Sequence, residues 1–208
     1  MSDSIQKYRN LLSVFCDQAE KHGDAPYLWS KNNKHYEFLS WNDTYLRVKK
    51  LANYLKKIGV ESDSKVMLIS ENRPEWQISD LAIMAADGIS VPAYTTITSQ
   101  DYEYLISHSE TKVIIVSSEL LYSKVELALN KLKIERDVII IDDFGPKKNN
   151  LITIHKWDEI QSEPADNNID HISYQAIRKN RKDIACIIYT SGTSGFPKGV
   201  MLSHGSIL

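Results

Sequence analysis

A loop near the end of the chain combines the residue types that bind anions, and residues 189–200 read YTSGTSGFPKGV. The hydroxyl side chains of this loop, which can donate hydrogen bonds, are Thr190, Ser191, Thr193 and Ser194. Gly192 and Gly195 let backbone N–H groups approach an anion without an intervening Cβ, and Lys198 adds one mobile positive charge. Together these residues predict a loop that holds a polyphosphate.

The spacing within this loop differs from other functional motifs. A Walker-type P-loop needs Gly-Lys-Ser/Thr, whereas Lys198 follows Pro197 and precedes Gly199. The sequence contains no G-x-G-x-x-G fingerprint, no G-x-S-x-G nucleophile elbow and no Cys/His set with metal-ligand spacing. A plain surface loop would explain the Gly and Ser residues, but not the apolar strand that leads in or the Pro-Lys-Gly exit.

The elements before the loop predict an α/β fold with a mostly parallel sheet layered with helices. Short apolar runs at 66–70, 89–94, 112–118, 137–142 and 183–190 are strand candidates. Helical segments are expected from Pro74 to Gly88, from a cap at Ser99 to Ser107, and over 119–132. Continuous apolar strands separated by helices are typical of parallel sheets covered on both faces, which bind ligands at the carboxyl ends of their strands. Pro92 indicates that its strand lies at an edge or ends there.

The remaining segments divide the chain into four parts. Residues 1–64 are expected to hold a helix over 5–19, a hairpin over 27–39, and a helix that begins at a Ser40/Asp43 capping box and stops at Gly59. Residues 65–142 form βα repeats, 143–182 an irregular connection, and 183–208 the last strand, the loop and the start of a helix at Ser203 or His204. All four parts are interpreted as pieces of one domain spanning 1–208.

Composition excludes several classes of protein. With 25 Lys+Arg against 27 Asp+Glu, no global field attracts nucleic acid or an anionic membrane, so any anion site must be local. Two cysteines, Cys16 and Cys186, make no disulfide framework and favour a cytoplasmic location. No signal peptide and no transmembrane-length apolar run is visible, while peripheral membrane contact is left open.

The stretch IIYTSGTSGFPKGVMLSH resembles the phosphate-loop signature of the adenylate-forming (AMP-binding) enzymes, the superfamily of acyl-CoA synthetases, peptide-synthetase adenylation domains and luciferases. The segments FLSWNDTYLRVKKLANYLKKIGV, KVMLISENRPEW and DLAIMAADGISVPAYTTIT fit the N-terminal part of the same superfamily in order. ENRPEW together with VPAYTT is most similar to the long-chain fatty acyl-CoA synthetase branch. The resemblance covers essentially the whole chain.

This resemblance implies that the chain binds ATP and takes part in activating a carboxylic acid. The implied acid is a long-chain fatty acid, which is converted to an acyl-adenylate and then to an acyl-CoA. Residues 190–195 would wrap the β- and γ-phosphates, with Phe196 and Pro197 completing the loop. Lys198 would stabilise the leaving pyrophosphate, and Thr190 would also reach Mg²⁺. ATP, Mg²⁺, coenzyme A and a fatty acid are the implied ligands.

Members of this superfamily continue beyond the loop to an acyl pocket, an acidic Mg²⁺ ligand, a ribose-binding aspartate, a hinge and a small C-terminal domain. The chain is therefore expected to be the N-terminal part of the large domain, truncated after the phosphate loop and inactive alone, with a complementary C-terminal chain left open. Two alternatives stay open. In the first alternative, the chain is a non-catalytic fragment of a split or disrupted acyl-CoA synthetase gene. In the second, the enzyme activates another class of acid, an aryl acid or an amino acid.

Other conspicuous polar residues have structural interpretations. Asn72, Arg73 and Trp76 are expected to begin and pack a helix, because Pro74 places them at its start. Residues 94–96 are interpreted as a turn in preference to a ligand contact.

Three isolated histidines, a cationic run and His204 are also interpreted as structural. His108, His155 and His171 lie in polar surroundings and are expected to be solvated. Residues 178–182, RKNRK, predict an exposed charged face. His204 is expected to cap the last helix and not to contact the nucleotide.

Overall fold

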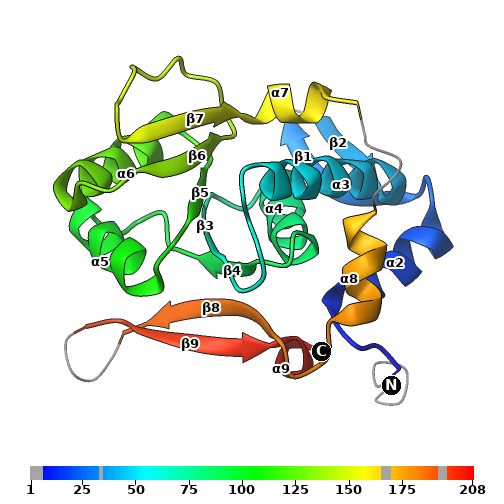
Figure 1. Cartoon of the computed structure of the whole chain (residues 1–208). Helices are drawn as coiled ribbons and strands as arrows, with labels where there is room; N and C mark the ends of the chain where they lie inside the picture. Colours follow the sequence, from blue (N-terminus) through cyan, green and yellow to red (C-terminus); the bar gives the residue numbers. More distant parts are fainter. Residues whose placement is uncertain (1–6, 33–34, 165–169, 192–195) are drawn as a thin grey trace.

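The fold is built around a seven-stranded, mostly parallel β-sheet (Figure 1). The computed structural model describes residues 7–32, 35–164, 170–191 and 196–208. The strand order is β7-β6-β5-β3-β4-β8-β9, and only the last pair, β8 and β9, is antiparallel. The strands are β3 Lys65–Ile69, β4 Ile89–Pro92, β5 Val113–Val116, β6 Arg136–Ile140, β7 Ile152–Lys156, β8 Ile184–Thr190 and β9 Lys198–Ser203. The predicted α/β class is confirmed.

Helices cover both faces of this sheet (Figure 1). One face packs against α2 Leu11–His22, α3 Trp41–Lys57, α4 Pro74–Ala85, α7 Trp157–Ser162 and α8 His171–Arg178. The other face packs against α5 Ser99–Ser109 and α6 Glu119–Leu132. The last helix, α9 His204–Ile207, follows β9. No helix in the described ranges is long and apolar enough to cross a lipid bilayer.

The continuous apolar strands are explained by these two layers. In β3, Val66 and Leu68 belong to the core on the α4 side, whereas Met67 and Ile69 belong to the core on the α5 side. Successive side chains of a strand point to opposite faces, so a strand buried on both faces needs apolar residues at every position. The sheet is therefore fully enclosed at its centre, and polar chemistry is confined to its ends and edges.

The hairpin and the helix after it follow the sequence pattern, whereas the first helix, expected over 5–19, spans Leu11–His22 because Asn10 caps it. Strands β1 Pro26–Asn32 and β2 His35–Ser40 form the predicted antiparallel hairpin, whose tip at 33–34 lies outside the described residues. Ser40 caps α3 by accepting a hydrogen bond from the Asp43 N–H at 3.0 Å, and Asp43 reciprocates to the Ser40 N–H at 3.2 Å. Gly59 follows the helix with φ +87°, a left-handed conformation that favours glycine.

Residues 143–182 contain regular structure where an irregular connection was expected. They hold β7, α7 and α8. Strand β7, with sequence ITIHK, pairs only with β6, and such an edge strand keeps polar side chains that break an apolar run. The six residues of α7 and eight of α8 are too few to give a clear helical period.

One local expectation is confirmed and one needs correction. Pro92 ends β4, which is the second of the two predicted alternatives, since β4 lies between β3 and β8 and not at an edge. The sheet tolerates this proline because the next residue, Ala93, donates its N–H to the Leu68 carbonyl at 3.0 Å. Thr98, not Ser99, caps α5, since its hydroxyl accepts from the Asp101 N–H at 3.2 Å in a capping box.

A partly buried carboxyl group makes stability depend on pH. Burial raises the pKa of Asp80, on α4, from 3.8 to about 6, and the nearby Ser90 hydroxyl opposes the shift. The folded state thus binds this proton more tightly than the unfolded state, so the free energy of unfolding falls as pH rises from about 4 to 6.

We therefore expect Asp80→Asn to raise the free energy of unfolding by about 1–3 kcal/mol at pH 7, with the gain disappearing near pH 4. Urea denaturation at four pH values between 4 and 7 measures this difference. Glu20→Gln, an exposed carboxyl on α2, is the matched control and should leave the profile unchanged. A gain of the same size at every pH would contradict the assignment.

Candidate phosphate-binding site

The strand that leads into the predicted loop ends where the sheet presents its carboxyl edge. Strand β8 runs parallel to β4, so Thr190 emerges at the same edge as Ser70 after β3 and Ala93 after β4. The chain returns as β9, which pairs antiparallel with β8. Figure 1 shows this pair as a long hairpin at one side of the sheet. The loop therefore lies where open α/β sheets bind ligands.

The register of β8 and β9 brings two predicted site residues together. Thr190 pairs directly with Lys198, and directly opposite residues of an antiparallel pair project from the same face. Both side chains are exposed, as is the following Ser191. A hydroxyl and an ammonium group thus stand side by side at the mouth of the loop.

The other predicted loop residues differ in exposure, and only some of them lie within the described residues. Phe196 has 68% of its surface exposed, whereas Pro197 is half-buried. The remaining predicted contacts lie outside the described residues, and they are Gly192, Thr193, Ser194 and Gly195.

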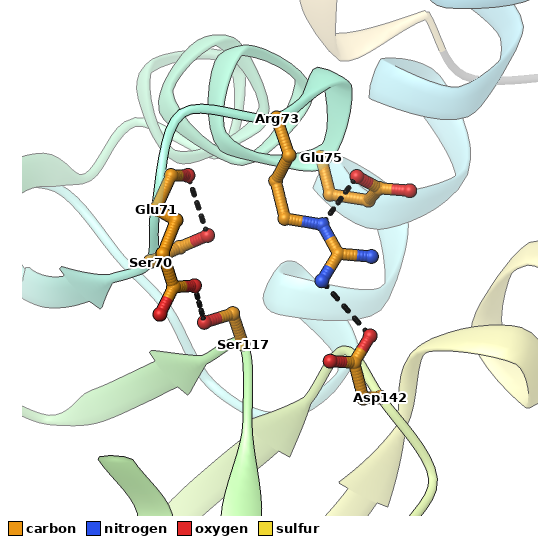
Figure 2. A network of polar contacts seen from close by, with 6 residues as sticks. All are labelled: Ser70, Glu71, Arg73, Glu75, Ser117 and Asp142. Carbon is orange, nitrogen blue, oxygen red and sulfur yellow. Dashed lines mark hydrogen bonds and ion pairs between the residues drawn. The ribbon is translucent and has the colours of Figure 1, made fainter. Parts of the chain in front are cut away.

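Lys198 differs from the cation at the neighbouring strand ends. In the described part of the chain, no carboxylate forms an ion pair with Lys198. Arg73, by contrast, donates from Nε to Glu75 at 2.7 Å and from Nη1 to Asp142 at 2.8 Å (Figure 2). Two carboxylates therefore neutralise Arg73, and Lys198 keeps its charge for a ligand.

The rest of the strand-end network in Figure 2 is also internally satisfied. Ser117, after β5, donates a short hydrogen bond to the Glu71 carboxylate, and Ser70 donates to the Glu71 carbonyl at 2.9 Å. These contacts join the turns that follow β3 and β5, while the Arg73–Asp142 pair adds the turn after β6. The network fixes the edge of the sheet beside the site.

A groove of about 510 Å³ runs along the carboxyl ends of β3, β4 and β8. Its lining residues are Ser70, Glu71, Asn72, Trp76, Pro92, Ala93, Tyr94, Thr95 and Ile188. Ile188 projects from the same face of β8 as Thr190, two residues further on. The groove therefore gives a ligand held at Thr190 and Lys198 room along the strand ends.

Residues assigned to a helix start and a turn contribute to this groove. Arg73 is the N-cap residue of α4 but makes no side-chain capping bond, and Trp76 packs on the core while also lining the groove. Tyr94, expected to be in a turn, is 68% exposed there, and its carbonyl accepts the Tyr102 hydroxyl at 2.7 Å. Thr96 does not line the groove.

Two of the histidines expected to be solvated are hydrogen-bonded. His155, with 11% of its side chain exposed, lies 2.9 Å from the Tyr54 hydroxyl and 2.8 Å from the Asp137 carboxylate. His108 is exposed, but its Nδ1 lies 2.8 Å from the Tyr189 hydroxyl. The prediction was therefore wrong for His155, whose partner Tyr54 lies 101 residues away, whereas the exposure of His108 agrees with it.

The cationic run at 178–182 is exposed as predicted at Arg178, Asn180 and Lys182, but Lys179 and Arg181 are partly buried. Lys179, with 13% of its side chain exposed, pairs with Asp87 at 2.6 Å. Arg181 donates to the Tyr8 carbonyl at 2.9 Å. The run instead ties the end of α8 to distant segments.

His204 does not cap the last helix, which corrects the prediction. Ser203 caps α9, and His204 is buried, with its Nδ1 accepting from the Leu11 N–H at 3.4 Å. Burial and, to a smaller extent, the positive charge of Lys179 lower the pKa of His204 to about 4, against the opposing effect of Asp183. The ring is therefore neutral at pH 7 and joins α9 to the start of α2.

The described residues fit Mg²⁺ only as an ion carried by a ligand. They contain no group of three or more His, Cys, Asp or Glu side chains that could hold a metal. Thr190 offers one hydroxyl oxygen at the mouth of the loop, and Mg²⁺ commonly binds through one or two protein oxygens, waters and substrate phosphates. Thr190 is thus compatible with a phosphate-borne Mg²⁺.

A parallel α/β sheet with a Gly- and hydroxyl-rich loop at its carboxyl edge defines a nucleotide- or phosphate-binding class of protein. Within that class, residues 15–208 match the AMP-binding enzyme family, and the chain belongs to this family.

Relatives in this family include long-chain acyl-CoA synthetases. The chain is 32% identical over 196 residues to the human long-chain-fatty-acid–CoA ligase ACSBG2, an alignment covering 93% of the chain and 29% of that protein. It is 30% identical over 217 residues to long chain acyl-CoA synthetase 4 of Arabidopsis thaliana, covering 99% of the chain and 32% of the relative. The chain thus spans about a third of the length of these relatives.

Solved structures share the fold at lower identity. The luciferase-like enzyme of the nonluminescent mealworm Zophobas morio superposes with a TM-score of 0.75 at 18% identity, covering 95% of this chain and 43% of that one. The anthranilate CoA ligase AuaEII, solved in complex with anthranoyl-AMP, gives a TM-score of 0.74 at 21% identity, covering 95% of this chain and 34% of that one. Both likenesses establish the α/β architecture.

Proposed function

We propose that this chain provides the phosphate-binding part of an enzyme that uses ATP to activate a carboxylic acid. The pairing of Thr190 with Lys198, which has no carboxylate partner among the described residues, at the carboxyl edge of the sheet carries this proposal. Membership of the AMP-binding enzyme family supports it, and the names of the relatives favour a long-chain fatty acid as the acid and coenzyme A as the acceptor.

The proposed chemistry assigns a role to each part of the loop. A carboxylate attacks the α-phosphate of ATP, an acyl-adenylate forms, and pyrophosphate leaves with additional negative charge. Lys198 stabilises that charge, and Thr190 and Ser191 donate hydrogen bonds to the β- and γ-phosphates. The sequence of residues 192–195 adds backbone N–H donors, and Phe196 and Pro197 lead back to Lys198.

Mg²⁺ bound with the nucleotide would neutralise part of the phosphate charge and orient the leaving group. The Thr190 hydroxyl is the group of this chain that we assign to it, because that oxygen lies beside Lys198 in the register. The acyl-adenylate then transfers its acyl group to the thiol of coenzyme A, releasing AMP and giving a thioester.

ATP–pyrophosphate exchange, measured with each acid of a panel, tests which class of acid is activated. The assay uses the protein as it is produced in cells. We expect exchange to depend on a long-chain fatty acid, with benzoate and amino acids inactive. Exchange supported only by an aryl or amino acid would overturn the fatty-acid assignment while keeping the phosphate site. Exchange that survives Lys198→Ala unchanged would overturn the role of the loop.

A further inference from the structure

Helix α5 contacts both arms of the β8–β9 hairpin on the face opposite to Thr190 and Lys198. Tyr189 precedes Thr190 and Pro197 precedes Lys198 in sequence, so each arm is contacted one residue from the site. Tyr104 and His108, four residues apart, lie on the same side of α5 and meet these arms. Neither side chain was expected from the sequence to have a role at the loop.

The contacts are specific and polar. The Tyr104 hydroxyl donates to the Pro197 carbonyl at 3.0 Å, and the His108 Nδ1 lies 2.8 Å from the Tyr189 hydroxyl. The Tyr104 ring stacks on the His108 ring, with centroids 5.2 Å apart, and lies 5.5 Å from the Phe196 ring. The two side chains of α5 thus support each other while each contacts a different arm.

The absence of a side chain at Gly199 allows this approach. A Cβ built at Gly199 would lie 2.9 Å from the Ile187 side chain and 3.3 Å from the Tyr189 ring. Gly199 also pairs with Tyr189 across the hairpin. The Tyr189 ring therefore packs against the backbone of Gly199, the residue that follows Lys198.

We propose that Tyr104 and His108 are positioning residues that fix the separation of Thr190 and Lys198 and so set the affinity for the phosphates. The proposal rests on the proposed function of the loop. It differs from a plain packing role, because packing alone would lower stability without acting through Lys198. The Tyr104 hydroxyl donates to the carbonyl that precedes Lys198, so removing that hydroxyl alone is expected to act on a phosphate through that residue.

Tyr104→Phe tests this inference, because it removes the hydroxyl and keeps the ring. We expect magnesium pyrophosphate to bind about fivefold more weakly, as measured by isothermal titration calorimetry, for the loss of one hydrogen bond. Tyr122→Phe removes a hydroxyl on α6 that lies 3.5 Å from Glu126, and as the matched control it should leave affinity unchanged. In a Lys198→Ala background, Tyr104→Phe should have no further effect. Equal affinity of Tyr104→Phe and wild type, or the same loss in both backgrounds, would overturn the inference.

A second measurement separates this inference from the function of the loop. If wild-type protein binds no pyrophosphate, the proposed function fails, and amide hydrogen exchange without ligand then decides the positioning role. Tyr104→Phe should speed exchange of the Phe196, Lys198 and Gly199 amides relative to Tyr122→Phe. Unchanged exchange at these amides would overturn the positioning role even if phosphate binding were normal.

Discussion

Lys198→Ala is expected to weaken the binding of magnesium pyrophosphate and Mg·ATP at least tenfold. Hydrogen bonds to charged groups contribute about 1.5–3 kcal/mol, which corresponds to a factor of roughly 10 to 150 in affinity. Lys198 can deliver this energy because no carboxylate among the described residues competes for its ammonium group. Isothermal titration calorimetry at fixed ionic strength measures the change.

A control must separate this local contact from the general attraction between a cation and an anion. Lys21→Ala, an exposed lysine near the end of α2, removes the same charge far from the loop and should leave the affinity within about twofold of wild type. Equal losses for Lys21→Ala and Lys198→Ala would show that only net charge matters. Unchanged affinity in Lys198→Ala would remove the residue from the site.

Asn10→Ala is expected to reduce the free energy of unfolding by about 3–5 kcal/mol. Asn10 is fully buried, and its Nδ2 donates to the carbonyls of Gln175, Ala176 and Lys179 at 3.3, 3.0 and 2.8 Å. These carbonyls lie at the end of α8, where the Gln175 carbonyl also accepts from the Lys179 N–H at 2.9 Å but the last carbonyls lack further backbone donors in an ideal helix. The Asn10 Oδ1 also caps α2 by accepting from the Ser13 N–H at 2.8 Å. Alanine therefore removes a helix cap, worth about 1 kcal/mol, and takes the Asn10 donor away from the Ala176 and Lys179 carbonyls at about 1–3 kcal/mol each.

Urea denaturation of two further variants separates the contribution of the α2 cap from that of the hydrogen bonds to the α8 carbonyls. Asn10→Ser keeps a capping hydroxyl but cannot reach three carbonyls, so its loss should be smaller than that of Asn10→Ala by about 1 kcal/mol. Asn42→Ala removes an exposed amide that donates to Asp24 at 2.8 Å, and it should cost less than about 1 kcal/mol. A loss for Asn10→Ala no larger than that for Asn42→Ala would contradict the bridging role of Asn10.

The parts of the fold that depend on local pattern could be predicted from the sequence. Apolar runs separated by helices identified the central parallel strands, because a strand buried on both faces leaves an unambiguous signal. The capping box of Ser40 and Asp43 located the start of α3 within one residue. The loop at 189–200 was recognised by composition, and the register later placed Thr190 beside Lys198.

The parts that depend on distant contacts could not be predicted. His155 meets Tyr54 and Asp137, which lie 101 and 18 residues away, so the polar neighbours in its own segment carried no information about burial. The same holds for His204, which packs at the start of α2. The bond from Tyr104 to Pro197 spans 93 residues, and a tyrosine on a helix gives no local sign of such a partner.

The central claim is that the β8–β9 loop binds the phosphates of ATP. The most direct test is a titration of the ¹⁵N-labelled 208-residue chain with magnesium pyrophosphate, followed by ¹H–¹⁵N NMR. Saturable shifts concentrated at Thr190, Ser191 and Lys198, with the distant hairpin β1–β2 unaffected, are the result predicted here. Saturable binding that shifts other residues and leaves these three unchanged would contradict the account.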